Sequence, residues 1–275
     1  MCGTGPYAIV GDMTDHPFRF GAVAGQAPDG AAWAALARRA ESLGYSTLLV
    51  PDTLGTFSPF TAAAAAAAVT TTLRVGTFVV SVPYRTPEAV AWETATLHTL
   101  TGGRFELGLG AGRPAAEQDA AALGVRFGTP RERIERLSKT IDAVKDVRIL
   151  IAAAGTKLLG LAARKADTVT LGVPPTYTEE QVGAKLDELY ELAGDRFAGL
   201  EIGLNLVAAA AEPPAWLRSR FGPLDATSTG LLTGTPGQMA DTLRHRRDKL
   251  GISYVSVNAQ FLDDFAPVVE RLAGT

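Results

Sequence analysis

The chain has 275 residues, of which 47% are apolar and 20% are charged, and its formal net charge at pH 7 is −3. This is the composition of a soluble globular protein with a large core. A weakly acidic chain with interspersed charges lacks the basic field that nucleic acid or an anionic membrane surface requires, so neither is expected as a partner.

The compartment is suggested by what the sequence lacks. No run approaches the ~20 apolar residues that cross a bilayer, and the first residues lack the pattern of a signal peptide. The single cysteine, Cys2, excludes an intrachain disulfide. We therefore expect a cytoplasmic protein.

Eight apolar segments alternate with helical segments along the chain. Most are continuous apolar or small runs, which is typical of parallel strands covered on both faces. The predicted strands cover residues 18–24, 47–51, 73–80, 105–110, 148–154, 168–173, 200–207 and 254–258.

Capping residues mark the helices between these strands. Asp29 begins one helix, and Ser58 and Thr86 each stand before a proline in a first turn. Trp33 and Trp92 fall at helical spacing with other apolar residues, and we expect both in the core. Capping boxes are predicted at Thr129 with Glu132, Thr178 with Gln181 and Thr235 with Gln238.

Strands that alternate with helices form either a closed (β/α)8 barrel or an open doubly wound sheet. The number of strands and the chain length favour the barrel. No linker or change of composition divides the chain, so we expect one barrel domain over residues 18–275 after a flexible leader over residues 1–17.

The active site of such a barrel lies on the loops that follow the strands. Asp52 and Thr53 follow the second strand, and Arg113 and Glu117 follow the fourth. Asp52, Arg113 and Glu117 each have a structural alternative, because Asp52 could cap the following turn and Arg113 could pair with Glu117 across one helical turn.

Small residues after the fifth strand suggest a site for a phosphate group. Ala154, Gly155 and Thr156 open a helix whose free backbone N–H groups favour an anion, and Lys157 would add a positive charge. The alternative is that Gly155 and Thr156 only cap this helix.

Other motifs exclude more than they predict. The Gly-Leu-Gly-Ala-Gly run at residues 108–112 is a poor dinucleotide fingerprint, because its glycine spacing is wrong, and we expect it to keep the barrel mouth open for a flat ligand. His16, His98 and His245 lack metal-ligand spacing, so no metal site is predicted. No Gly-x-Ser-x-Gly elbow of a serine hydrolase is present.

Several motifs, in order along nearly the whole chain from Phe18 onward, resemble the bacterial luciferase-like flavin and deazaflavin oxidoreductases, especially their actinobacterial deazaflavin-linked branch. The most specific is Leu-Thr-Gly-Gly-Arg at residues 100–104, followed by Leu-Gly-Leu-Gly-Ala-Gly at 107–112. The others lie at residues 37–45, 49–52, 73–77, 151–155, 162–167 and 233–236.

This resemblance implies a cofactor, either coenzyme F420, which we favour, or FMN. Its ring would lie in the barrel mouth near Thr53 and Gly112. A bulge near Phe78 and Val79, which in this family often contains a non-proline cis peptide, would back the ring. The resemblance places the phosphate at Ala154, Gly155 and Thr156, and it also implies a homodimer.

Three features depart from the family pattern. Thr53 stands where many relatives have a histidine, which removes a general acid or base. Arg113 stands where several deazaflavin dehydrogenases have a glutamate, and a fixed cation there suits an anionic substrate or a reduced ring. The insertion that relatives carry before the fifth strand is missing, which predicts a more open pocket.

We therefore expect an oxidoreductase or monooxygenase that reduces or oxygenates a small organic molecule of secondary metabolism, with Asp52, Arg113 and Glu117 orienting the substrate or the ring. One alternative is a barrel without cofactor that acts as an isomerase, a cyclase or a binding protein. Another is a regulatory subunit that partners an active homologue.

Overall fold

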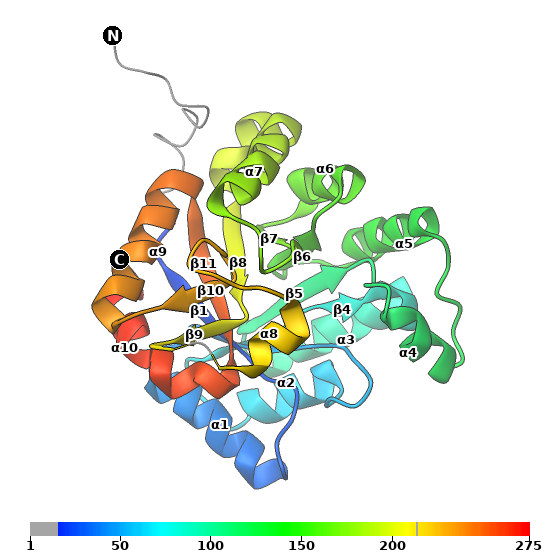
Figure 1. The fold of residues 1–275 in the computed structure, drawn as a ribbon. Coiled ribbons are helices and arrows are strands. Elements are labelled where there is room, and N and C mark those ends of the chain that lie inside the picture. The colour runs from blue at the N-terminus through cyan, green and yellow to red at the C-terminus, as the bar shows by residue number, and fades with distance from the viewer. Residues whose placement is uncertain (1–15, 213) are drawn as a thin grey trace. The chain divides into compact units, whose positions relative to one another are not determined.

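The computed structural model describes residues 16–212 and 214–275 (Figure 1). The predicted leader therefore lies outside the described residues, except for His16 and Pro17. The chain forms two compact units, one of Val23–Ala152 and one of Ala153–Thr275 together with the N-terminal residues up to Ala22. That residues 18–275 form a single domain stays a prediction.

The unit Val23–Ala152 contains a parallel sheet in the order β2–β3–β5–β6, and the short strand β4 pairs with the end of β5. Its strands are β2 (Thr47–Val50), β3 (Arg74–Thr77), β4 (Val80–Ser81), β5 (Phe105–Gly110) and β6 (Ile149–Ala153). Its helices are α1 (Gly30–Ser42), α2 (Pro59–Ala67), η2 (Val82–Tyr84), α3 (Pro87–Leu100), α4 (Ala116–Ala122) and α5 (Pro130–Ala143). Every residue of β2 and β5 is buried, which explains why these strands read as continuous apolar or small runs.

The other unit contains a parallel sheet in the order β1–β11–β8–β7 and a two-stranded parallel pair, β9 with β10. Its strands are β1 (Arg19–Val23), β7 (Thr168–Leu171), β8 (Glu201–Leu206), β9 (Ala208–Ala210), β10 (Leu231–Thr233) and β11 (Ile252–Asn258). Its helices are α6 (Thr156–Lys165), α7 (Glu179–Ala193), η3 (Gly194–Gly199), α8 (Trp216–Phe221), α9 (Pro236–Leu250), η4 (Ala259–Phe261) and α10 (Leu262–Leu272). Its core includes Phe20 of β1, whose ring meets that of Phe265 of α10 edge to face at 5.6 Å.

The predicted caps are present with one exception. Asp29 and Thr86 accept backbone hydrogen bonds at the starts of α1 and α3, whereas Ser58 makes no such bond at α2. All three predicted capping boxes are formed, at the starts of α5, α7 and α9.

Two further predictions concern surface and length. Trp33 is buried and donates from Nε1 to the Ala62 carbonyl at 2.9 Å, but Trp92 is 75% exposed, so its placement in the core was wrong. Residues 144–148 connect α5 directly to β6, and that relatives carry an insertion at this point stays a prediction. Among the described residues, no helix has the length and apolar run that crossing a membrane requires.

Candidate functional site

Asp52 directly follows β2, and its carboxylate binds the chain around β4. Its Oδ2 atom accepts hydrogen bonds from Arg85 Nη1 at 2.6 Å and from the Ser81 backbone N–H at 3.0 Å. Its Oδ1 atom accepts from Arg85 Nη2 at 3.3 Å, and the side chain is 8% exposed. Asp52 therefore connects the end of β2 to the end of β4, and the alternative that it caps the following turn is wrong.

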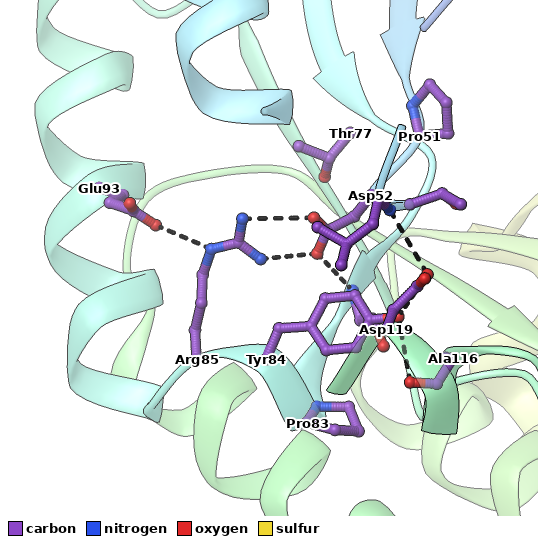
Figure 2. Close-up of polar contacts among 12 residues, drawn as sticks. Pro51, Asp52, Thr77, Pro83, Tyr84, Arg85, Glu93, Ala116 and Asp119 are labelled. Atoms are coloured by element: carbon purple, nitrogen blue, oxygen red, sulfur yellow. Dashed lines mark hydrogen bonds and ion pairs between the residues drawn. The ribbon is translucent and has the colours of Figure 1, made fainter. Parts of the chain in front are cut away.

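Arg85 connects Asp52 to a second carboxylate, as Figure 2 shows. Its Nε atom lies 3.5 Å from Oε2 of Glu93, and its guanidinium carbon lies 5.5 Å from the centre of the Phe60 ring. Burial raises the pKa of the Glu93 carboxyl, although the charge of Arg85 acts in the opposite direction. Sequence reasoning missed the role of Arg85, although the residue stands shortly after a strand, and it missed Glu93 because that residue lies inside a helix.

The Phe78–Val79 peptide bond, between β3 and β4, is cis, as the family resemblance implied. Both residues are half-buried. On the neighbouring strand β5, Gly108 and Gly110 have no space for a side chain. A Cβ atom at Gly108 would lie 2.0 Å from the Thr77 carbonyl oxygen, and one at Gly110 would lie 2.6 Å from Val79 Cγ2. These two glycines are therefore required by the adjacent chain, and that the run of residues 108–112 keeps the barrel mouth open for a flat ligand stays a prediction.

Arg113 and Thr53, predicted separately, lie together. Arg113 is exposed, and its Nη2 atom donates to Thr53 Oγ1 at 3.2 Å. Glu117 is exposed in the first turn of α4 and, among the described residues, does not pair with Arg113. Gly112 has φ +85°, and a Cβ atom there would lie 2.9 Å from the Phe127 ring, so a glycine is needed at this turn.

A second polar contact in Figure 2 joins Tyr84 to Asp119. The Tyr84 hydroxyl lies 3.1 Å from Asp119 Oδ2, which also accepts from the Leu54 backbone N–H at 3.4 Å. Burial and the Asp119 carboxylate raise the pKa of Tyr84 to about 12, so its hydroxyl remains a donor at neutral pH. Asp119 thereby links α4 to the loop after β2. Sequence reasoning missed it because α4 was not predicted.

The predicted phosphate residues belong to the other unit, at the start of α6. Gly155 is the residue before the helix and offers no side-chain cap. Its carbonyl accepts from the N–H groups of Leu158 and Leu159. The backbone N–H groups of Thr156 and Lys157 have no acceptor among the described residues.

The side chains at the start of α6 are less favourable to an anion than its backbone. The Thr156 hydroxyl is in hydrogen-bonding reach of Glu188 on α7 and lowers the pKa of that carboxyl. Gly155 and Thr156 are exposed, while Ala154 is half-buried. The backbone donors are therefore better suited to a phosphate than the hydroxyl is.

Asn205 and Ser256 form a polar pair that sequence reasoning also missed. They are register partners on β8 and β11, and the Ser256 hydroxyl lies 3.0 Å from Asn205 Oδ1. Two polar residues inside apolar strands could have signalled this pair. In the part of the chain that the structure describes, no group of three or more His, Cys, Asp or Glu side chains could hold a metal ion.

The segment that holds Asp52, Arg85 and the cis peptide also matches a known protein family. Residues 14–148 match the family model of the luciferase-like monooxygenases. These residues are just under half of the chain, and over them the chain is similar to the luciferase-like monooxygenases. The resemblance stated from the motifs is thereby confirmed.

Curated relatives of this luciferase-like chain are matched only in part. The 4-hydroxyprotoasukamycin monooxygenase of Streptomyces nodosus subsp. asukaensis is 37% identical over 103 residues, which cover 38% of this chain and 24% of that enzyme. The matched region also spans less than half the length of other curated relatives.

Solved structures resemble the luciferase-like chain over most of its length. The coenzyme F420-dependent tetrahydromethanopterin reductase from Methanopyrus kandleri has a TM-score of 0.70 at 16% identity, covering 93% of this chain and 97% of that chain. A riboflavin lyase with a modified FMN and riboflavin has a TM-score of 0.70 at 14% identity, covering 93% of this chain and 92% of that chain. This likeness confirms the predicted (β/α)8 barrel fold.

Proposed function

We propose that the chain is a luciferase-like oxidoreductase that uses a reduced deazaflavin or flavin to reduce or oxygenate a small organic molecule. The observation that carries this proposal is the segment of residues 78–81, which is attached to Asp52 and packed against the glycines of β5 within the family-matched residues. The F420-dependent reductase and the FMN-containing lyase of the same fold support it. We favour coenzyme F420, because the motifs resemble the deazaflavin-linked branch.

The unit Val23–Ala152 fits a flat ring. Phe78 and Val79 are half-buried, and Val79 packs against Gly108 and Gly110, so β5 backs this short segment on one side. Apolar surfaces with a few fixed polar groups are typical of cofactor sites. When bound, a reduced deazaflavin supplies a hydride and a reduced flavin supplies electrons to oxygen.

The start of α6, in the other unit, fits a phosphate group. The N–H groups of Thr156 and Lys157 have no acceptor among the described residues, and the Lys157 side chain is exposed. Both the backbone donors and the helix dipole favour an anion there. We assign phosphate binding to this backbone, next to Gly155.

The three predicted catalytic residues take different roles in this proposal. Asp52 orients the segment under the ring, because donors already occupy both of its oxygens. Arg113 is exposed and held by Thr53, so it offers a cation to an anionic substrate or a reduced ring. Glu117 is exposed in the same turn region and would orient a substrate donor.

Cofactor titration tests the proposal. Purified protein is titrated with coenzyme F420 and with FMN, each oxidised and reduced, and binding is followed by fluorescence quenching and calorimetry. We expect micromolar binding of one of them. The Gly155→Glu variant should weaken this binding by about tenfold or more, because it places a negative charge beside the phosphate.

The chain offers a matched control at the same position. Gly155 has φ −87°, and a Cβ atom there would meet nothing within 4 Å, so side chains fit without distortion. The neutral Gly155→Gln variant should therefore bind nearly as well as the wild type. Absence of binding of any cofactor form up to millimolar concentration would reject the redox proposal in favour of a barrel that acts as an isomerase, a cyclase or a binding protein.

We also assign the protein to the cytoplasm and its substrate to secondary metabolism. The similarity to the 4-hydroxyprotoasukamycin monooxygenase of Streptomyces supports an organic substrate of this kind. The single cysteine supports a reducing compartment.

We propose a homodimer that forms through α3. Trp92 and Leu100 of this helix are each 75% exposed, and the exposed residues between them, Ala95, Thr96 and Thr99, carry no charge. Two copies can bring such faces together without like-charge repulsion. Trp92→Glu should convert a dimer to a monomer in light scattering after size exclusion, whereas Leu123→Glu, on the exposed Leu123 after α4, should not.

A further inference from the structure

Arg85 is the centre of a series of ion pairs that connects Asp52, directly after β2, to Glu93 of α3 (Figure 2). Its two Nη atoms face the two oxygens of Asp52 at 2.6 and 3.3 Å, and its Nε atom faces Glu93 at 3.5 Å. The Arg85 side chain is 19% exposed and lies over the buried Phe60 ring. A planar guanidinium held by two carboxylates and an aromatic ring has its orientation fixed.

The segment that contains the cis peptide is attached to the end of β2 at two points. At its start, the Phe78 backbone N–H donates to the Val50 carbonyl at 2.8 Å. At its end, the Ser81 N–H donates to Asp52 Oδ2 at 3.0 Å. The first attachment needs only main chain, whereas the second depends on where the Asp52 carboxylate points.

We propose that Arg85 is the positioning residue of this site. It holds the Asp52 carboxylate where it receives the Ser81 N–H, and it thereby fixes the position of Phe78 and Val79. Glu93 holds Arg85 from the other side. The inference rests on the proposed function at one point, that Phe78 and Val79 support the cofactor ring. Arg85 itself contacts no reacting group.

A second ion pair in the same unit allows a purely structural role to be distinguished. Arg74, the first residue of β3, pairs with Glu106 of β5 and donates from Nη2 to the Gly103 carbonyl at 3.1 Å. Glu106, like Asp52, is largely buried. Removing either arginine takes a cation away from a buried carboxylate, but of these two arginines only Arg85 is joined to the segment of residues 78–81.

The experiment compares Arg85→Met with Arg74→Met, and uses Arg85→Lys and Glu93→Leu as milder variants should Arg85→Met fail to fold. Hydrogen exchange of the Ser81 amide reports on the segment without any ligand. In Arg85→Met we expect this exchange to be about tenfold faster than in the wild type, with Arg85→Lys and Glu93→Leu between them. In Arg74→Met the Ser81 amide should remain protected.

Cofactor binding provides the second readout. The Kd for coenzyme F420 or FMN should rise about tenfold in Arg85→Met and should change less than about threefold in Arg74→Met. Equal effects of the two methionine variants on Ser81 exchange and on Kd would overturn the inference, as would wild-type values in Arg85→Met. A wild-type protein that binds neither cofactor would refute the proposed function alone, because the Ser81 amide still decides whether Arg85 positions the segment.

Discussion

Gly108 is the residue at which β5 comes closest to the chain beside it. A Cβ atom there would lie 2.0 Å from the Thr77 carbonyl oxygen, which belongs to backbone and cannot rotate away. We expect Gly108→Ala to lower the free energy of unfolding by about 3 kcal/mol, the upper end for overpacked sites, and to displace the adjoining cis segment. Urea unfolding measures this loss.

The control for this substitution is Gly30, at the start of α1, where a Cβ atom would meet nothing within 4 Å. Gly30→Ala should stabilise the protein by up to about 1 kcal/mol, because alanine is the better helix former. A similar loss in both variants would show that the close approach at Gly108 is not what determines the result.

Single residues of the site were only partly predictable from the sequence. The position of Asp52 followed from its place after a strand, but its partner Arg85 did not, because the pairing depends on how two loops approach in space. Trp92 was misplaced for another reason. Helical spacing identifies an apolar face but does not show whether that face is covered, and the outer face of α3 is exposed.

The helix caps are the features for which the predictions from the sequence agree best with the observed structure. The Thr178 side chain accepts from the Gln181 N–H, and the Gln181 side chain accepts from the Thr178 N–H in return. Thr178→Ala should therefore cost about 1 kcal/mol of stability. Ser58 precedes α2 without a side-chain cap bond, so Ser58→Ala should cost no more than a few tenths of a kcal/mol. Thermal unfolding of the two variants side by side tests this difference.

Elements were predictable when they were long or strongly patterned. All eight predicted strands exist, and the third is divided into β3 and β4, which lie on either side of residues 78 and 79. The missed elements include the three-residue strands β9 and β10 and the short helices α4 and α8. A segment of only a few residues is too short to show a hydrophobic period, so only its tertiary packing defines it.

At the scale of the whole molecule, the ion pairs at the beginnings of strands serve stability, whereas the candidate site residues follow the ends of strands. Arg19 of β1 binds Glu201 of β8, which also accepts from Thr168 of β7 at 2.8 Å. Arg74 and Glu106 make a corresponding pair in the other unit. In (β/α)8 barrels the ends where strands begin serve stability, whereas the opposite ends carry the site. Asp52, Arg85 and the Phe78–Val79 segment follow strand ends, in agreement with this division.

Acid should destabilise the folded protein through carboxylates whose pKa is lowered on folding, and Glu41 is the clearest of them. Its Oε1 atom accepts from the backbone N–H groups of Thr71, Thr72 and Leu73 at 2.8, 2.6 and 2.9 Å. Burial acts to raise the pKa of Glu41, but these hydrogen bonds outweigh it and lower the pKa to about 2.

Because the pKa of Glu41 is lower in the folded state, its contribution to stability is fully present above about pH 4.5 and is lost as the pH falls towards 2. Glu41→Gln keeps an acceptor oxygen but removes the charge, so it should cost about 1 kcal/mol at pH 7. The difference in unfolding free energy between wild type and variant should shrink steadily below pH 4.5. Urea titrations at a series of pH values measure it, and a difference that stays constant down to pH 3 would show that the charge of Glu41 does not stabilise the loop before β3.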